Sequence, residues 1–119
     1  MRVEPRYVHL LFLAYVAGVV VLMFAPVPAS APSLPGFDKF VHVGVFLLFG
    51  ALLYWDRSET SRADATSVIL MTSAAAGLVE LIQIVLPYRS GSMLDFVAGV
   101  LGGVVGALAM RQLLRMPTL

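Results

Sequence analysis

Seven polar side chains stand out in this sequence because they occur at, or just inside, the ends of strongly apolar segments: Asp38, Lys39, His42, Glu80, Gln83, Arg89 and Asp95. An imidazole and carboxylates can transfer protons, and the cations of lysine and arginine can hold an anion. Hydrocarbon penalises an ionisable residue at mid-depth by about 2.5–3.5 kcal/mol, so such residues in a membrane segment indicate a functional site. These seven residues are therefore the candidate site.

Three kinds of chemistry are open to them. Lys39 and Arg89 could bind the phosphate or carboxylate of a lipid headgroup, with Asp38, Gln83 and Asp95 as further ligand-binding residues. Alternatively, His42 and Glu80 could be catalytic, the histidine acting as acid or base and a carboxylate orienting its ring, or Asp, His and Glu could hold a divalent metal ion. In the third interpretation the charges pair with one another and Gln83 bridges helices. Neither a helical metalloprotease motif nor a phosphate-binding loop is present, so the sequence assigns no metal and no cofactor.

The composition is that of a membrane protein. Of the 119 residues, 60% are hydrophobic and only 13% charged, with a mean hydropathy of +0.92, whereas an average globular chain has about 25% charged residues. The net charge of +1 favours no nucleic-acid partner, and the absence of cysteine excludes disulfides, thiolate metal sites and a cysteine nucleophile.

Four apolar runs are long enough to cross a bilayer, since about 20 residues span its hydrocarbon core. They cover residues 7–25, 38–55, 65–86 and 92–114. Four prolines interrupt the chain between the first two runs, five charged residues separate the second and third, and a tight turn at 87–91 joins the last two. The sequence predicts an all-α, four-transmembrane-helix bundle of two antiparallel helical hairpins, forming a single domain over residues 1–119.

The first run has a rival interpretation as a secretory signal. Arg2 and Arg6 precede it, and Ala29, Ser30 and Ala31 imitate a cleavage site. Because the apolar stretch is longer than the usual 7–15 residues and a proline follows at position 32, we expect this segment to be retained as a helix.

Lys and Arg predict the orientation, because cytoplasmic loops are enriched in them. Lys39 and Arg89 flank one side, and the other side has Arg2, Arg6, Arg57, Arg62, Arg111 and Arg115. Both termini should therefore be cytoplasmic. At 1.5 Å of rise per residue, His42, Glu80, Gln83 and Asp95 then lie about 5–9 Å inside the outer ends of three helices, where they could face one another across a small pocket. We expect Arg89, with Glu80 and Asp95, to form the centre of this site. His9 falls on the cytoplasmic side, apart from the rest.

The last run carries glycines at the four-residue spacing that lets helices approach closely: Gly99, Gly102, Gly103 and Gly106. We expect this face to pack inside the chain, with helices 65–86 and 92–114 tightly packed together, and keep a homo-oligomer interface as the alternative.

A family resemblance rests on the order and spacing of Asp38-Lys39-x-x-His42, Glu80-x-x-Gln83, Pro87, Arg89, Asp95 and Gly102. On these residues, the sequence resembles the VanZ-like family of small bacterial membrane proteins over residues 38–106. The resemblance implies a four-helix multi-pass protein, and the namesake of the family is associated with resistance to the glycopeptide teicoplanin. It brings no settled catalytic mechanism. One departure is Gly99, where the family often has Asn.

The resulting hypothesis is a protein of the bacterial inner or plasma membrane whose outer-leaflet pocket binds an anionic cell-envelope lipid, or a lipid-linked glycan or peptidoglycan precursor, and influences teicoplanin susceptibility. An envelope-lipid-modifying enzyme using His42 as acid or base, and a structural subunit of a membrane assembly, are the alternatives. Whether the protein is an enzyme stays open from the sequence.

Overall fold

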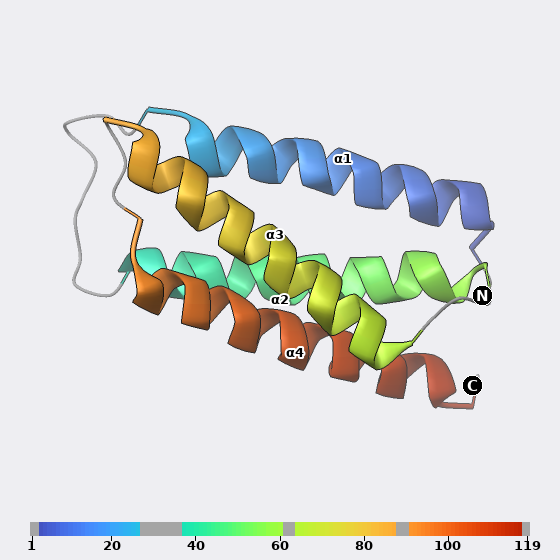
Figure 1. The fold of residues 1–119 in the computed structure, drawn as a ribbon. Helices are drawn as coiled ribbons and strands as arrows, with labels where there is room; N and C mark the ends of the chain where they lie inside the picture. The colour runs from blue at the N-terminus through green and yellow to red at the C-terminus, as the bar shows by residue number, and fades with distance from the viewer. Residues whose placement is uncertain (1–2, 27–36, 61–63, 88–90, 118–119) are drawn as a thin grey trace.

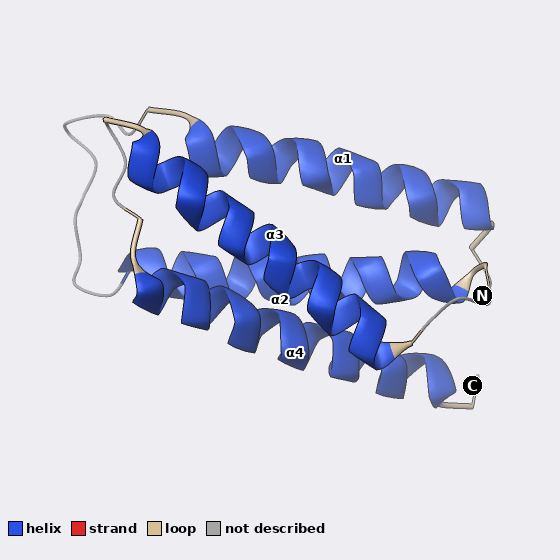
Figure 2. Ribbon diagram, viewed as in Figure 1, coloured by secondary structure: helices blue, strands red, loops and turns tan. Residues whose placement is uncertain are grey.

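The computed structural model describes residues 3–26, 37–60, 64–87 and 91–117, and these form four helices: α1 (Pro5–Phe24), α2 (Phe37–Ser58), α3 (Ala65–Val85) and α4 (Met93–Arg115). No strand occurs among these residues (Figure 2). The predicted all-α class is confirmed. The predicted bounds differ by at most three residues, the largest difference being the end of α2, which continues beyond Trp55 to Ser58.

The helices alternate in direction, so that α1 begins and α4 ends at the same end of the bundle (Figure 1). At the opposite end, called the polar end here, α1 and α3 finish and α2 and α4 start. α3 crosses obliquely in front of α2 in the view of Figure 1, and α2 contacts all three other helices. The two antiparallel hairpins are therefore present, and which end faces the cytoplasm stays a prediction.

Local sequence explains where three of the helices begin. Pro5 occupies the first turn of α1, where a missing backbone N–H is tolerated. Asp64 caps α3 by accepting the N–H of Ser67 at 3.4 Å, and Ser92 caps α4 by accepting the N–H of Asp95 at 3.0 Å. Each cap satisfies a backbone donor that would otherwise have no partner inside the helix.

The exterior is far more apolar than that of a protein in water, and several charged side chains are buried. Large apolar side chains such as Phe40 and Val85 are 81% exposed, whereas His42, Glu80 and Asp95 are buried. All four helices are long and apolar enough to cross a membrane. Since a bilayer offers hydrocarbon to an apolar exterior, the chain is a multi-pass membrane protein with four candidate spans.

The glycines of α4 make the closest helix contact in the bundle, and its partner is mainly α2. A Cβ placed on Gly102 or Gly106 would collide with the backbone carbonyls of Val43 and Leu47. The carbonyl oxygen of Gly103 would lie 2.5 Å from a Cβ on Gly50 of α2, whereas a Cβ on Gly103 itself would collide with the side chain of Thr72 of α3. The expected packing of α3 with α4 is present, but the α2–α4 contact is more extensive. The glycine face is thus used inside the chain, as expected, and a homo-oligomer stays an untested alternative.

Candidate functional site

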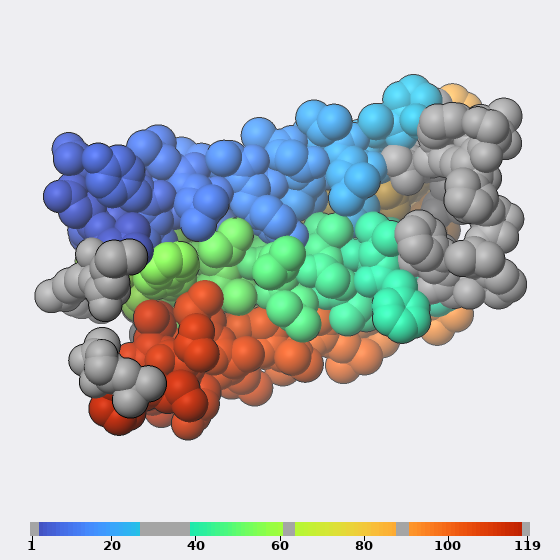
Figure 3. Space-filling view, turned by 180° about the vertical axis from the view of Figure 1, so that it is seen from behind, coloured from blue at the N-terminus to red at the C-terminus, as the bar shows by residue number. Residues whose placement is uncertain are grey.

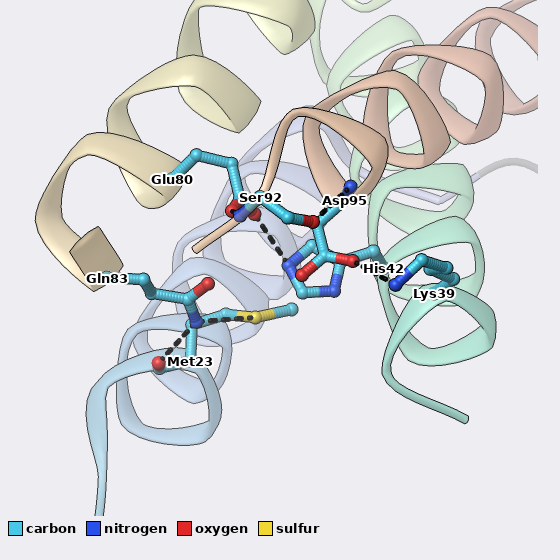
Figure 4. Close-up of polar contacts among 7 residues, drawn as sticks. All are labelled: Met23, Lys39, His42, Glu80, Gln83, Ser92 and Asp95. Atoms are coloured by element: carbon cyan, nitrogen blue, oxygen red, sulfur yellow. Dashed lines mark hydrogen bonds and ion pairs between the residues drawn. The ribbon is translucent and has the colours of Figure 1, made fainter. Parts of the chain in front are cut away.

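His42 and Glu80 form the buried centre of the polar end. His42 lies in the second turn of α2 and Glu80 in the last turns of α3, and each residue is only 5% exposed. Their Nε2 and Oε1 atoms are 2.8 Å apart (Figure 4). Beneath them the ring of Phe46 stacks on the imidazole, with centroids 6.4 Å apart, so the pair is closed off from the middle of the bundle by an aromatic side chain.

Asp95 and Lys39 extend this centre toward the outside of the bundle. Asp95, in the first turn of α4, is 2% exposed, and its Oδ1 lies 3.3 Å from the Nζ of Lys39. The lysine side chain is 40% exposed. Lys39, His42, Glu80 and Asp95 are called the charged cluster below, and Lys39 is its accessible edge.

Ser92 positions both carboxylates of the charged cluster. Its hydroxyl accepts the backbone N–H of Asp95, and its own N–H donates to Oε2 of Glu80 at 2.9 Å. In a common helix start, the acidic residue three positions after the cap would accept that N–H itself. Here Glu80 of another helix accepts it, which leaves the Asp95 carboxylate free to face Lys39.

Gly91 leaves enough room for Glu80 to reach the backbone N–H of Ser92. A Cβ at this position would lie 2.8 Å from the backbone oxygen of Glu80, 3.2 Å from its Oε2 and 2.7 Å from Ile84. The end of α3 and the start of α4 can approach one another this closely because residue 91 has no side chain.

The donor set of the charged cluster suits a proton or a metal ion. One ligand atom each from His42, Glu80 and Asp95 lies within 4.8 Å of the others, and all three residues are buried. Oε1 of Glu80 lies within ion-pair distance of His42, and Oδ1 of Asp95 lies within that distance of Lys39. Neither oxygen accepts an aligned hydrogen bond from the described part of the chain. Two buried oxygens therefore retain lone-pair capacity at the centre of the cluster.

Gln83 lies beside the charged cluster but points elsewhere. Its Nε2 donates to the backbone oxygen of Met23 at 2.8 Å, near the end of α1 (Figure 4). The amide thus satisfies a carbonyl in the last turn of a helix, where no intrahelical donor exists. The predicted bridge between helices is present, and the role of Gln83 as a ligand-binding residue stays a prediction.

The structure does not describe the side chains of two of the seven predicted residues. Asp38 lies in the first turn of α2, with its side chain outside the described set, and Arg89 lies outside the described residues altogether. We expected Arg89, Glu80 and Asp95 to form the centre of the site. In the described part of the chain that centre is His42 with Glu80, flanked by Lys39 with Asp95.

The sequence analysis did not identify Ser92 as part of the site. A signal existed, because Ser92-x-x-Asp95 before an apolar run is the pattern of a helix cap. His9, in contrast, is apart from the cluster as expected. It contacts Asp56 at 3.0 Å and is exposed.

An apolar groove of about 550 Å³ between α1 and α2 is separate from the charged cluster. Gly18 and Gly44 leave space in it, and the hydroxyl of Tyr15, on its wall, donates to the backbone oxygen of Val45. The view in Figure 3 shows the face on which α1 and α2 lie side by side. No charged side chain lines the groove, so it belongs to the hydrocarbon-facing surface.

Comparison with known proteins gives one informative match. The chain is 32% identical over 103 residues to an uncharacterized protein of Schizosaccharomyces pombe, covering 82% of this chain and 64% of that protein. The chain therefore spans somewhat less than two thirds of this relative. No family model matches the chain, and no solved structure matches it significantly. Membership of the VanZ-like family stays a prediction, as does a bacterial membrane, because the relative is fungal.

Proposed function

We propose that this protein binds a lipid with an anionic headgroup at the polar end of its bundle. The observation that carries the proposal is the ion pair of Lys39 with the buried Asp95, in which the lysine side chain remains 40% exposed. A cation held by a buried carboxylate keeps a fixed position, and its exposed part lies at the depth of the headgroups, where a basic side chain attracts anionic lipid.

The charged residues behind Lys39 support the same proposal. Replacing a buried ion pair with apolar side chains is often neutral or stabilising, so helix packing alone gives no reason for four ionisable groups here. The His42–Glu80 and Lys39–Asp95 pairs lie together at one end of the bundle, where a headgroup would lie if the helices cross a bilayer. The anionic lipid would be a phospholipid or a lipid-linked glycan. The family resemblance adds an effect on teicoplanin susceptibility as a further expectation.

Native mass spectrometry of the protein released from mixed phosphatidylglycerol and phosphatidylcholine nanodiscs tests this function. Removing one basic contact near a charged lipid surface costs about 1 kcal/mol, so Lys39→Gln should lower phosphatidylglycerol retention roughly fivefold. Arg57→Gln, at the opposite end of α2, is the matched control and should keep it. Equal retention in the wild type and Lys39→Gln would overturn the proposal.

An enzyme acting on such a lipid is the second candidate, favoured by the 2.8 Å contact between His42 Nε2 and Glu80 Oε1. This distance is within reach of proton transfer, with the carboxylate orienting the ring. His42→Ala should abolish turnover of an envelope lipid while the protein remains folded. A structural subunit docking through the α4 glycines receives no support, because that face is buried against α2 and α3.

A further inference from the structure

The charged cluster has too little positive charge to attract an anion by itself. Within the charged cluster, two carboxylates face one lysine, so the net charge is −1 when His42 is neutral. Protonating His42 brings the net charge only to zero. A phosphate would therefore approach a site without excess positive charge.

We propose that one nitrogen of His42 and one carboxylate oxygen each of Glu80 and Asp95 hold a divalent first-row metal ion, and that this ion binds the phosphate of the lipid. With neutral His42, the bound ion changes the net charge of the cluster from −1 to +1. The inference rests on the proposed function for the identity of the ligand, whereas the metal site itself stands on the geometry of three residues.

The distances suit such an ion. Two ligand atoms that each lie about 2.1 Å from one ion are separated by about 3.0–3.4 Å. Nε2 of His42 and Oε1 of Glu80 are 2.8 Å apart, and all three ligand atoms are within 4.8 Å of one another. One imidazole with two carboxylates is a donor set for Mn²⁺, Fe²⁺ or Zn²⁺.

The surroundings also suit an ion. Residues that bind metals are usually oriented by hydrogen bonds to their other polar atoms, and the N–H of Ser92 holds Oε2 of Glu80 in this way. That bond leaves Oε1 directed at His42. Oε1 and the Oδ1 of Asp95 are buried without an aligned hydrogen bond from the described residues, although both lie at ion-pair distance from a cation. A metal ion would use this lone-pair capacity.

Mn²⁺ titration of the full chain in detergent, followed by the loss of the free-ion EPR signal, tests the metal site without any lipid. The wild type should bind one ion per chain, and Glu80→Gln and Asp95→Asn should weaken binding at least tenfold. Asp56→Asn and His9→Gln, a carboxylate and an imidazole paired at the other end of the bundle, are matched controls and should bind normally. Glu80→Asp, which keeps the charge on a shorter side chain, replaces Glu80→Gln if that variant does not fold. Absence of saturable binding in the wild type, or equal losses in the controls, would overturn the metal site.

Phosphatidylglycerol retention measured with EDTA and with added Mn²⁺ separates the metal bridge from the proposed function. We expect retention to rise at least tenfold with Mn²⁺. Retention that EDTA leaves unchanged would refute the bridge and leave anionic lipid binding standing. If Mn²⁺ binds but phosphatidylglycerol is not retained under either condition, the proposed function fails, the bridge fails with it, and the metal site remains.

Discussion

Adding one methyl group at Gly106 should separate α2 from α4, whereas adding it at Gly44 should not. The Cβ of an alanine at position 106 would overlap the carbonyl oxygen of Leu47, and it would lie 2.7 Å from the carbonyl carbon. Both are backbone atoms, so no side-chain rotation relieves the contact. At Gly44 nothing lies within 4 Å of the added carbon. The two positions therefore isolate steric overlap from the general effect of replacing glycine in a helix.

The expected magnitude follows from two opposing terms. Alanine in place of glycine stabilises a helix interior by about 0.5–1 kcal/mol, and this gain applies to both variants. Overpacking a tight interior costs about 1–3 kcal/mol, and this cost applies only to Gly106→Ala. The gain cancels in the comparison, so Gly106→Ala should be about 1–3 kcal/mol less stable than Gly44→Ala.

Thermal unfolding in detergent micelles, followed by the fluorescence of the single tryptophan, Trp55, measures this difference. At roughly 4 °C per kcal/mol, Gly106→Ala should unfold about 4–12 °C below Gly44→Ala. Equal midpoints would mean that α2 and α4 do not approach through these glycines. A higher midpoint for Gly106→Ala would refute the packing argument altogether.

Two further variants test how the polar end is built. Gln83→Leu removes the donor to the backbone oxygen of Met23 and should lower stability by about 0.6–2 kcal/mol in the same unfolding assay; an unchanged midpoint would show that the bond carries no stability. Gly91→Ala places a carbon 2.8 Å from the backbone oxygen of Glu80 and 2.7 Å from Ile84, so it should displace the Glu80 carboxylate and weaken Mn²⁺ binding about tenfold. Mn²⁺ affinity equal to that of the wild type would show that the turn does not position Glu80.

The fold was predictable because its determinants are local. Span length and apolar content predict four helices without reference to tertiary structure, and the prolines between residues 26 and 35 separate the first two. Depth along each helix then placed His42, Glu80 and Asp95 at one end, since 1.5 Å per residue applies to any regular helix. These expectations required only the helical repeat and the alternation of direction.

Pairing across helices was not predictable in the same way, because it depends on how each helix is rotated and tilted. The glycines of α4 predicted a close contact without identifying α2 as the main partner. Depth alone also did not distinguish the pairing of Lys39 with Asp95 from pairing with Glu80. The crossed cap, in which Ser92 donates to Glu80 while accepting from Asp95, required knowledge that α3 ends beside the start of α4.

That crossed cap bears on why the polar end is charged at all. If Asp95 accepted the N–H of Ser92 in the usual manner, its carboxylate would serve helix α4 alone, and Oε2 of Glu80 would lose the donor that holds it. Exchanging the acceptor costs α4 no hydrogen bond, since Glu80 takes the same N–H. It leaves one oxygen of each carboxylate directed at His42 and Lys39 inside the bundle. An arrangement needed only for stability would gain nothing from holding two carboxylates close together at such depth, because like charges there repel. Binding a cation between them gives this arrangement a physical reason.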